Sequence, residues 1–572
     1  MNIIDTSFEV EYELVDVSAA ADATSTSSNV KSFSDISLLS EGTNFDNQGT
    51  LEHNFFVLDG SFSEFEDDPE VAFFSTAMSN RNGTFSTNPK VTITFTVQHS
   101  SAGLTLYFAD DSPKACTIKW YNIANEFIDS IDQVISQKIQ VVYKGIENYS
   151  KIVIEFTKAR PYRYIKLNKV LFGIINIWDE TNIAAGTLVE ENDMINNQLS
   201  INKLNFDFVD DENKYNLGNA TGNHLFIQRG QVVKPYEYIR SNRNYLGDYF
   251  IDSFSQNNGL ITFSCMDYLG LLESVKYYRG DVYNGALAGP ILEHIFETAS
   301  ITNYTIDEDT YNTPIYGTLK PDTCRNVLRE ILFACQSTMD KTRRTGFNII
   351  KRGKIIANNI TRSRKISTKA SKREYVSGVE VKYTELALKA DRSEILNGTY
   401  GAGDNLIIFN SPYTSIQSTV GTIIESGKYF CILRLAEESV VKLTGIGYDS
   451  STLSTTYTEL VSGGEVENVK SFNSEICNLE MARDLAERIY TYYTYKLTLD
   501  IQYLADSENI LDWSTVENSD KDYKSYIAGF ESINTDLTNG FIATAKLTGY
   551  YDYTNEELYT GTELYCGDNF II

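Results

Sequence analysis

Alternating apolar and polar residues recur along most of the chain with a period of two. In residues 8–14 apolar side chains alternate with glutamates. In residues 91–97 four apolar residues share one face and three threonines the other. This period is typical of strands that are buried on one face only. Similar short runs continue between about 70 and 175, with turn residues between them, and predict a β-sandwich. The predicted strands are 91–97, 103–108, 116–121, 138–143, 150–156 and 164–167.

The pattern changes further along the chain. Residues 198–208 alternate over most of their length, and residues 245–254 and 259–265 predict two neighbouring strands, so a second β region extends from about 176 to 275. Apolar residues then recur at helical spacing in three places. The predicted helices are 287–296, 327–335 and one that begins near Asn478, and the predicted strands beside them are 346–350, 496–501 and 541–547.

Three segments near the N-terminus depart from strict alternation. Residues 19–28 are small and polar and predict a flexible loop. Residues 53–60 predict a strand that ends in a turn. The acidic run 64–70 is most simply a solvated, self-repelling loop. A calcium site is the minor alternative there, because the run lacks the ordered spacing of a calcium-binding loop.

Composition supports a β-rich protein and argues against a nucleic-acid partner. The 572 residues include 38 tyrosines and 30 phenylalanines but only 9 prolines, which favours strands. The net charge is −28, whereas phosphate binding requires a basic surface. One basic cluster, Lys341–Arg344 with Lys351 and Arg352 nearby, departs from this acidity. Such a cluster is more often a solvated turn than a phosphate site.

The cysteines and the chain start bear on the cellular setting. The seven cysteines are dispersed, which predicts reduced thiols in the core and assembly in a reducing cytoplasm. The start, Met1–Asp5, lacks the features of a signal peptide, and no run of about 18 apolar residues exists, so no membrane insertion is expected.

Motifs of catalysis are largely missing. The sequence contains no G-x-S-x-G, H-E-x-x-H or Walker A motif. The four histidines, His53, His99, His224 and His294, lie far apart and are each more often structural than catalytic. Abundant carboxylates leave a glycosidase pair open on residue type alone. No enzyme activity, catalytic residue, metal or cofactor is therefore predicted.

The sandwich contains one candidate binding site, for a glycan. Tyr107, Trp120 and Tyr121 could offer flat apolar faces to sugar rings, while Asp110 and its neighbour Asp111 accept hydrogen bonds from hydroxyl groups. The alternative is that Trp120 fills the core and the tyrosines cap it, and this is the commoner use of aromatic residues.

Residues 247–272 resemble the first barrel of phage tail hub proteins. There a strand of the type G-x-[FY]-[FY]-I precedes one that ends A-x-D-x-L-G-L-L. Here the strands read Gly247–Phe254 and Phe263–Leu272, with Cys265 in place of the alanine. The helix that contains 324–331 matches the family only in part. The region 482–549, with Asn539-Gly540-Phe541 near its end, resembles the helix and last barrel. Together the resemblance covers roughly 176–550.

The chain thus resembles the tail tip or baseplate hub of a Firmicute phage, a prophage or a phage tail-like bacteriocin. Residues 50–175 resemble the carbohydrate-binding-like sandwich that some of these hubs carry. The resemblance implies a mainly β fold with α+β parts: a jelly-roll-like β-sandwich, two tube-like β-barrel hub domains and a small α+β domain. The predicted parts are 1–50 (strand and loop), 51–175 (sandwich), 176–275 (first hub barrel), 276–368 (α+β domain) and 369–572 (second hub barrel with a helix).

The resemblance also implies a function and partners. Such hubs look like homotrimers whose barrels form a pseudo-sixfold ring between the tail tube or distal tail protein and the spike or tip protein, beside other baseplate proteins. DNA would pass only transiently, and we expect acidic residues to line the lumen so that it does not adhere. A neutral or basic lumen would contradict this expectation.

Two alternatives remain. The first is a receptor-binding protein whose sandwich grips a cell-wall glycan. The second is a tail-associated hydrolase. Lytic domains, where such hubs carry them, follow the last barrel, and the end of the chain at Ile572 argues against one. The expected location is the virion tail tip or baseplate.

Overall fold

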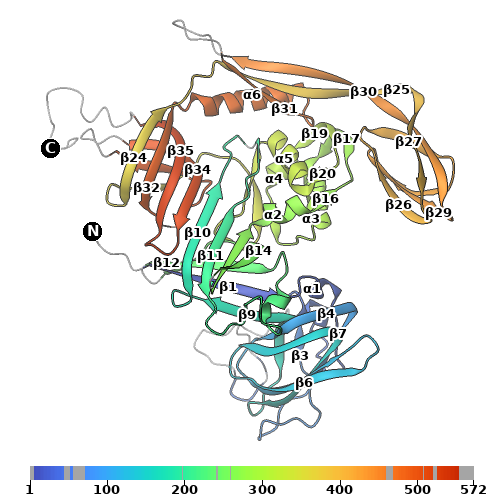
Figure 1. Cartoon of the computed structure of the whole chain (residues 1–572), viewed down its shortest axis with the longest axis vertical. Helices are drawn as coiled ribbons and strands as arrows, with labels where there is room; N and C mark the ends of the chain where they lie inside the picture. Colours follow the sequence, from blue (N-terminus) through green and yellow to red (C-terminus); the bar gives the residue numbers. More distant parts are fainter. Residues whose placement is uncertain are drawn as a thin grey trace, which may run out of the picture.

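The computed structural model describes residues 6–43, 50, 52–55, 71–195, 197–239, 242–257, 259–458, 468–506, 508–518 and 525–552. Within these ranges the protein is mainly β with α+β parts, as the sequence predicts. Figure 1 shows the sandwich at one end, a broad sheet with helices beside it in the middle, and a long arm at the other end. In the described part of the chain, none of the helices has the length and apolar content that a membrane crossing requires.

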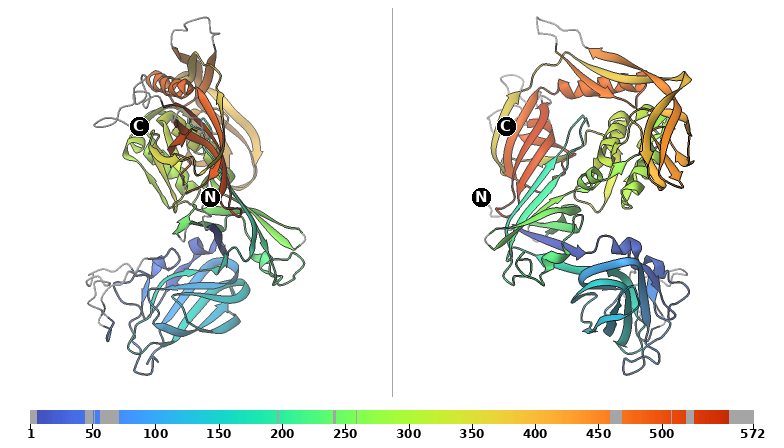
Figure 2. Two further views of the ribbon diagram at one scale, coloured as in Figure 1. Left: turned by 90° about the vertical axis from the view of Figure 1, so that its left-hand side faces the viewer. Right: turned by 45° about the vertical axis from the view of Figure 1, so that its right-hand side comes forward.

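The sandwich is inserted between two strands of the central sheet, β1 (Thr6–Val15) and β9 (Gly173–Trp178). Figure 2 shows it standing apart from that sheet. Its seven strands pair in the order β3-β8-β4-β7-β5-β6, with β2 beside β4. They are β2 (Thr24–Thr26), β3 (Phe73–Phe74), β4 (Lys90–Phe108), β5 (Pro113–Tyr121), β6 (Phe127–Val134), β7 (Ile139–Ala159) and β8 (Lys166–Leu171), and the short helices are α1 (Ala19–Asp22) and η1 (Ile36–Leu39).

Two predicted strands of the sandwich form one long bent strand. The segments 91–97 and 103–108 both belong to β4, whose pairing with β7 shifts register between Thr94 and Gly103. Each shift is a bulge that bends the strand. A Cβ at Gly103 would lie 2.0 Å from the carbonyl oxygen of Val142, so the close approach of the two strands requires glycine there.

The central sheet, called here the hub sheet, has 14 strands. Its main path runs β24-β32-β35-β34-β10-β11-β15-β14-β12-β1-β9. The first half contains β1, β9, β10 (Ile183–Glu191), β11 (Lys203–Val209), β12 (Val232–Ile239), β13 (Asn242–Tyr245), β14 (Tyr249–Asn257) and β15 (Leu260–Met266), near the short helix η2 (Asn223–Phe226). The second half contains β23 (Ile356–Ile360), β24 (Lys365–Lys372), β32 (Leu497–Leu504), β33 (Trp513–Glu517), β34 (Ser525–Asp536) and β35 (Ile542–Tyr551).

Backbone pairing between β10 and β34 joins the two halves. Thr187–Glu191 of β10 pairs antiparallel with Ser532–Asp536 of β34. Each half has its own apolar core behind the sheet, one around Phe206 and Phe263 and the other around Leu499 and Ile501. The two predicted barrels are therefore one continuous surface with two cores.

The α+β region lies beside the first half of the hub sheet and packs against it through α2, and its helices confirm the predicted ones (Figure 1). Thr323 caps α5, because its side chain accepts a hydrogen bond from the backbone N–H of Asn326. The strands β18, β22 and β21 form a small sheet beneath the helices. The elements are α2 (Tyr268–Ser274), α3 (Ala288–Thr298), α4 (Glu308–Tyr311), α5 (Cys324–Cys335), β16 (Lys276–Tyr277), β17 (Asp281–Leu287), β18 (Tyr304–Ile306), β19 (Pro314–Leu319), β20 (Asp322–Thr323), β21 (Ser337–Asp340) and β22 (Phe347–Lys351).

A long arm interrupts the second half of the hub sheet between β24 and β32. Its shaft is the pair β25 (Gly378–Tyr400) and β30 (Ser439–Thr458) with β31 (Val469–Ser474), and helix α6 (Leu479–Thr494) packs along it. Asn478 caps α6, as predicted. The tip contains β26 (Gly403–Ile408), β27 (Tyr413–Ser418), β28 (Thr422–Ser426) and β29 (Phe430–Leu435).

These elements correct several predicted boundaries. The region 1–50 divides, because β1 belongs to the hub sheet. The α+β part runs from α2 to β22, and the region 369–572 contains the arm. The predicted loop 19–28 contains α1 and β2, which pairs with β4. Residues 52–55 form a turn, whereas the rest of the predicted strand 53–60 and the acidic run 64–70 lie outside the described residues.

Candidate functional site

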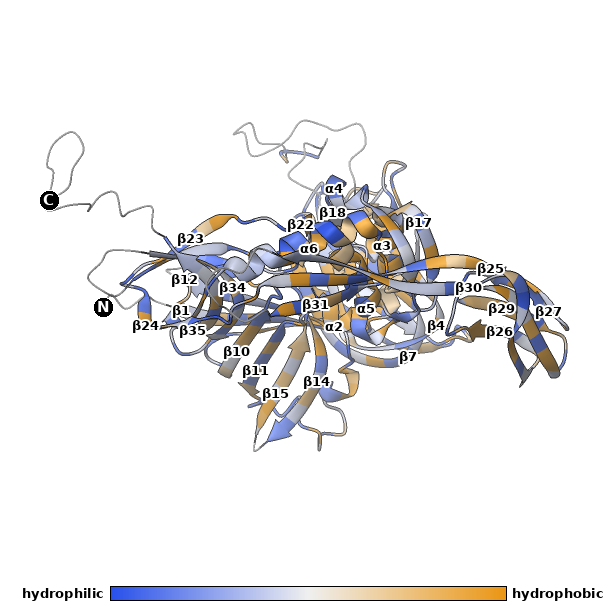
Figure 3. Ribbon diagram, turned by 90° about the horizontal axis from the view of Figure 1, so that it is seen from above, coloured by the Kyte–Doolittle hydropathy of each residue, from blue (hydrophilic) through white to orange (hydrophobic). Residues whose placement is uncertain are grey.

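Eight neighbouring strands of the hub sheet expose one polar face, from β24 through β32, β35, β34, β10, β11 and β15 to β14. The register aligns the outward side chains in rows. One row runs Asp536, Thr187, Asn205, Ser264 and Ser253. Figure 3 shows β10, β11, β15 and β14 side by side with hydrophilic and hydrophobic residues alternating along them. The face therefore continues across the boundary between the two halves.

A second row crosses from the far edge of the sheet. It runs Ser367, Gln502, Thr544, Asn534 and Val189, and ends at Lys203. All of these side chains are partly or fully exposed, whereas the alternate residues of β32, β35, β34, β10 and β11 are buried behind the sheet. Hydroxyl and amide side chains are the commonest groups in these two rows, which contain a Ser, Thr, Asn or Gln on each of the eight strands.

Charges on the polar face are few and nearly balanced. Lysines and carboxylates alternate, as in the row Lys369, Asp500 and Lys546. The charged residues of the face are Lys203, Lys369, Lys546, Glu191, Asp207, Asp500, Asp536 and Glu531, which lies 2.8 Å from Lys546. The acidity of the chain therefore is not concentrated here, although the net charge is −28.

The strands at the two ends of the polar face have unpaired edges within the described residues. Strand β24 pairs only with β32. Strand β14 pairs with β15 along its length, but with β12 only at Tyr249 and Phe250, so residues 252–257 present a free edge. An unpaired edge is a template for another strand.

Behind the polar face lies a buried cluster of charges, called here the ionic junction: Lys341, Arg343, Glu190, Glu237, Asp267 and Glu508. Arg343 lies 3.6 Å from Glu237 and 4.0 Å from Glu190, and its Nε donates to the backbone oxygen of Glu508 at 2.9 Å. Lys341 lies 2.5 Å from Asp267. The junction thus connects both halves of the hub sheet to the α+β region.

Burial shifts the protonation of the ionic junction. The buried position of Glu190 raises its pKa to about 7, against the opposing effect of Arg343. Burial likewise lowers the pKa of Lys341, although Asp267 opposes this. The predicted solvated turn at Lys341–Arg344 is therefore wrong. The cluster is basic because it faces buried carboxylates that are distant in the sequence.

The structure does not assemble the predicted glycan platform. Trp120 is 0% exposed in the sandwich core, so its ring offers no face to a ligand. Tyr121 lies on the other side of β5, with Lys151 Nζ 4.9 Å from its ring centroid. Tyr107 is half-buried, and Asp110 lies 2.9 Å from the buried Lys166 Nζ. Asp111 is paired with Arg160. Core packing, the alternative interpretation of Trp120, describes its position.

The histidines and cysteines have structural positions. His99 lies between Asp16 and Asp22, at 3.0 and 2.9 Å, where the sandwich meets the hub sheet. His294 lies 3.1 Å from the hydroxyl of Tyr277. The six described cysteines are unpaired and buried, and Cys566 lies outside the described residues. Among the described residues, no group of three metal-ligating side chains converges.

Sequence reasoning missed the polar face. The outward positions of 198–208, 496–501 and 541–547 combine Asn and Thr with lysines and aspartates. Lysines and carboxylates in such strands are typical of an ordinary solvated sheet face, so the sequence alone does not single out this surface. Only the pairing of β10 with β34 shows that they share one surface.

No protein-family model matches the sequence, and no curated protein has significant sequence similarity to it. Among solved structures, a tail protein from Neisseria meningitidis is similar at 8% identity and a TM-score of 0.38, over 65% of this chain and 93% of that one. A prophage tail protein from Shewanella oneidensis is similar at 12% identity and a TM-score of 0.38, over 65% and 95%.

The sandwich has a neighbour of its own. A family 32 carbohydrate-binding module from C. perfringens, solved with galactose, is similar at 8% identity and a TM-score of 0.19, over 29% of this chain and 99% of that one. These neighbours include tail proteins and a carbohydrate-binding module, the two classes of protein that the sequence resembles. At TM-scores below 0.5 they assign no function to this chain.

Proposed function

We propose that this chain is the structural hub of a phage or phage-like tail tip, in which three copies close into a ring around a channel. The observation that carries the proposal is the single polar face that the two halves of the hub sheet build together. A sheet of this width with one solvated face and two cores behind it is suited to line a channel.

The dimensions of the face fit such a ring. Each copy contributes eight neighbouring strands, from β24 to β14. Three copies give about 24 strands, which at a spacing of ~4.8 Å and a tilt of roughly 40° enclose a bore about 40–50 Å across between backbones. Closure would also remove the free edges, which otherwise favour aggregation.

The free edges give the ring a specific contact. In this proposal β24 of one copy pairs with residues 252–257 of β14 in the next copy. The β24 edge carries the exposed lysines Lys369 and Lys372, whereas the β14 edge carries Asp252. Opposite charge across two edges favours this pairing over pairing of like edges.

The chemistry of the polar face suits passage of DNA without adhesion. Affinity for DNA comes mainly from cations that neutralise phosphates. The face instead offers hydroxyl and amide groups and nearly balanced charges. If it lines the lumen, the expectation of an acidic lumen is wrong, and DNA passes because the wall lacks a net positive charge.

Partners follow from the same arrangement. The ring would join the tail tube or distal tail protein on one side and the spike or tip protein on the other. The sandwich and the arm extend away from the hub sheet, where they are placed to contact neighbouring baseplate proteins (Figure 1).

The oligomeric state of the purified chain tests the proposal. We expect a trimer by light scattering and closed rings by negative-stain microscopy. The double variant Lys369→Glu/Lys372→Glu should shift the trimer toward monomer. The matched control Lys90→Glu/Lys158→Glu, on the exposed sandwich surface, should leave the trimer intact. Circular dichroism checks that each variant folds.

Three outcomes would contradict the proposed ring. They are a monomeric wild-type chain at all concentrations tested, a ring of another stoichiometry, and equal behaviour of the edge variant and its control. Retention on purified bacterial cell walls would instead favour the receptor-binding alternative, and release of soluble wall fragments would favour a hydrolase.

A further inference from the structure

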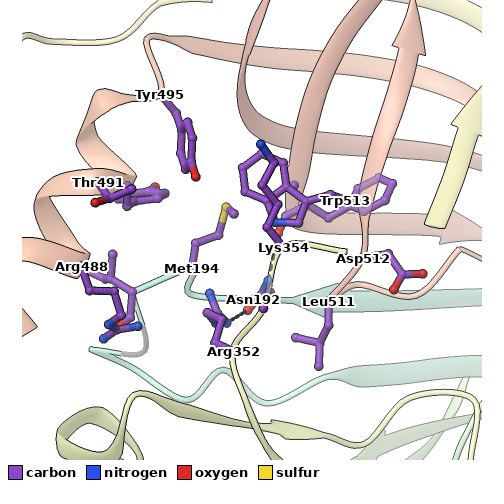
Figure 4. A pocket seen from close by; sticks show the side chains of 15 residues that line it. Asn192, Met194, Arg352, Lys354, Arg488, Thr491, Tyr495, Leu511, Asp512 and Trp513 are labelled. Carbon is purple, nitrogen blue, oxygen red and sulfur yellow. Dashed lines mark hydrogen bonds between the residues drawn. The ribbon is translucent and has the colours of Figure 1, made fainter. Parts of the chain in front are cut away.

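A cavity of about 220 Å³ lies where the two halves of the hub sheet meet the C-terminal end of helix α6, at the base of the arm. Five segments line it: the chain after β10, the chain after β22, the last turns of α6, the chain before β33, and β34 at Gly529 and Phe530. Figure 4 shows Arg352 and Arg488 on one side of this cavity and Trp513 on the other. We propose that the cavity binds a small oxyanion between the two guanidinium groups.

The two arginines have fewer partners than their burial requires. Arg352 donates from Nη2 to the side-chain oxygen of Asn192 at 2.5 Å, and Arg488 donates from Nη2 to the backbone oxygen of Ile195 at 2.9 Å. The Nε of each is buried without a hydrogen-bond partner. Within the described residues neither guanidinium has an ion-pair partner, which is costly for a buried charge.

The electrostatics of the cavity agree with this geometry. Burial lowers the pKa of Arg352 to about 9 and that of Arg488 to about 10, and the neighbouring Arg488 lowers that of Arg352 further. Asp193 opposes both shifts but does not cancel them. The site therefore holds two cations that lack an adequate negative counterpart.

The other charged groups at the cavity are already occupied. Lys354 donates to the hydroxyl of Tyr550 at 2.5 Å and lies 4.8 Å from the ring centroid of Trp513. Asp512 accepts from the side-chain amide of Asn358 at 3.0 Å. Burial raises the pKa of Asp512, so this carboxyl is a weak counter-ion.

An oxyanion satisfies what the cavity lacks. Guanidinium groups bind carboxylate and phosphate oxygens through paired N–H donors. The volume holds one phosphate-sized ion and a few waters, at roughly 30 Å³ per water, but not a nucleotide or an oligosaccharide. The hydroxyls of Thr491 and Tyr492 at the wall already donate to the backbone oxygen of Glu487 and to Glu531, so the two guanidinium groups are the donors for the anion. Bound there, the anion connects α6 to both halves of the hub sheet and stabilises their relative position.

Calorimetric titration of the full chain with inorganic phosphate tests this site. We expect saturable binding of one phosphate per chain, and a rise in melting temperature that follows phosphate and not the same ionic strength of chloride. Arg352→Gln and Arg488→Gln should each weaken binding by at least about tenfold. Arg488→Lys keeps the positive charge but loses the paired N–H donors of the guanidinium group, so it should weaken phosphate binding less than Arg488→Gln does.

The matched control is Arg434→Gln, at an exposed arginine on the arm tip that is paired with Asp404. It should bind phosphate as the wild type does. A parallel titration with acetate distinguishes a carboxylate site from a phosphate site. No binding of either anion by the wild-type chain, or equal binding by all variants, would overturn the proposal. Direct titration of the wild type keeps the test valid if a variant fails to fold.

Discussion

The polar face and the ionic junction lie on opposite sides of the same sheet and use charge in opposite ways. On the polar face, lysines and carboxylates are few, solvated and interspersed with hydroxyl groups. In the ionic junction, Arg343 and Lys341 are buried against three carboxylates of the first half, and Arg343 also donates to the backbone oxygen of Glu508 in the second half. Solvated charges are screened and contribute little to stability, whereas a buried charge is costly once its partner is removed.

This comparison shows why the net charge of −28 does not describe any functional surface. The face that we assign to the channel is close to neutral, and the densest charges are hidden. Solubility and repulsion between chains depend on the total charge, but passage of DNA depends on the composition of one face. The two regions therefore make different predictions for substitutions of the same chemical type.

The largest expected effect is at the ionic junction. Arg343→Met removes the cation between Glu190 and Glu237 and leaves both carboxylates uncompensated. We expect the free energy of unfolding of the hub sheet to fall by about 3–5 kcal/mol. Denaturant unfolding monitored by tryptophan fluorescence measures this. The exposed Arg434→Met on the arm tip serves as control and should leave the midpoint unchanged. Equal effects of the two substitutions would contradict a buried, coupled junction.

A smaller effect is expected from pH at the same junction. Burial raises the pKa of Glu190 to about 7 in the folded chain, above the ordinary value near 4.5. The folded state therefore holds this proton more tightly than the unfolded state. The stability it contributes is present below about pH 4.5 and is lost as pH rises to about 7, by roughly 3 kcal/mol. Glu190→Gln cannot titrate.

The measurement is the difference in melting midpoint between wild type and Glu190→Gln across this range. The melting midpoint of the variant should rise relative to that of the wild type between about pH 4.5 and 7. Above about pH 7 the difference between the two midpoints should stay constant. A difference that is constant from pH 4.5 to 8 would mean that Glu190 is ionised in the folded chain with an ordinary pKa.

Local periodicity was sufficient to predict the elements. The helices α3, α5 and α6 and most sandwich strands lie where apolar spacing predicts them, because each is determined by residues close in sequence. The bend of β4 and the split of 245–254 into β13 and β14 were not predicted. They depend on bulges and on Gly247, whose φ of 118° lies in a region that favours glycine.

Long-range partners could not be predicted in the same way. The pairing of Thr187 with Asp536 builds the polar face, but no local pattern links these residues. The burial of Arg343 depends on carboxylates in β10 and β12 and that of Lys341 on Asp267 after β15, which a count of basic residues cannot locate. Trp120 shows the converse error, because an aromatic residue beside aspartates suggests a ligand site until its burial is known.

The smallest effect on stability, and the sharpest test of the comparison, comes from new charges on the polar face. Thr187→Lys with Asn534→Lys adds cations at two outward positions near the boundary between the halves. Because both sites are solvated, we expect the free energy of unfolding to change by less than about 0.5 kcal/mol for each substitution.

In the assembled ring, however, these lysines would face DNA. Electrophoretic mobility shifts with duplex DNA should then show binding that weakens as salt rises, which the wild-type ring should lack. A matched pair on the sandwich, Thr92→Lys with Thr94→Lys, adds the same charge away from the channel and should not produce it. If the sandwich pair binds DNA as strongly as the polar-face pair, total charge and not the composition of this face controls adhesion, and the assignment of the face to the channel fails.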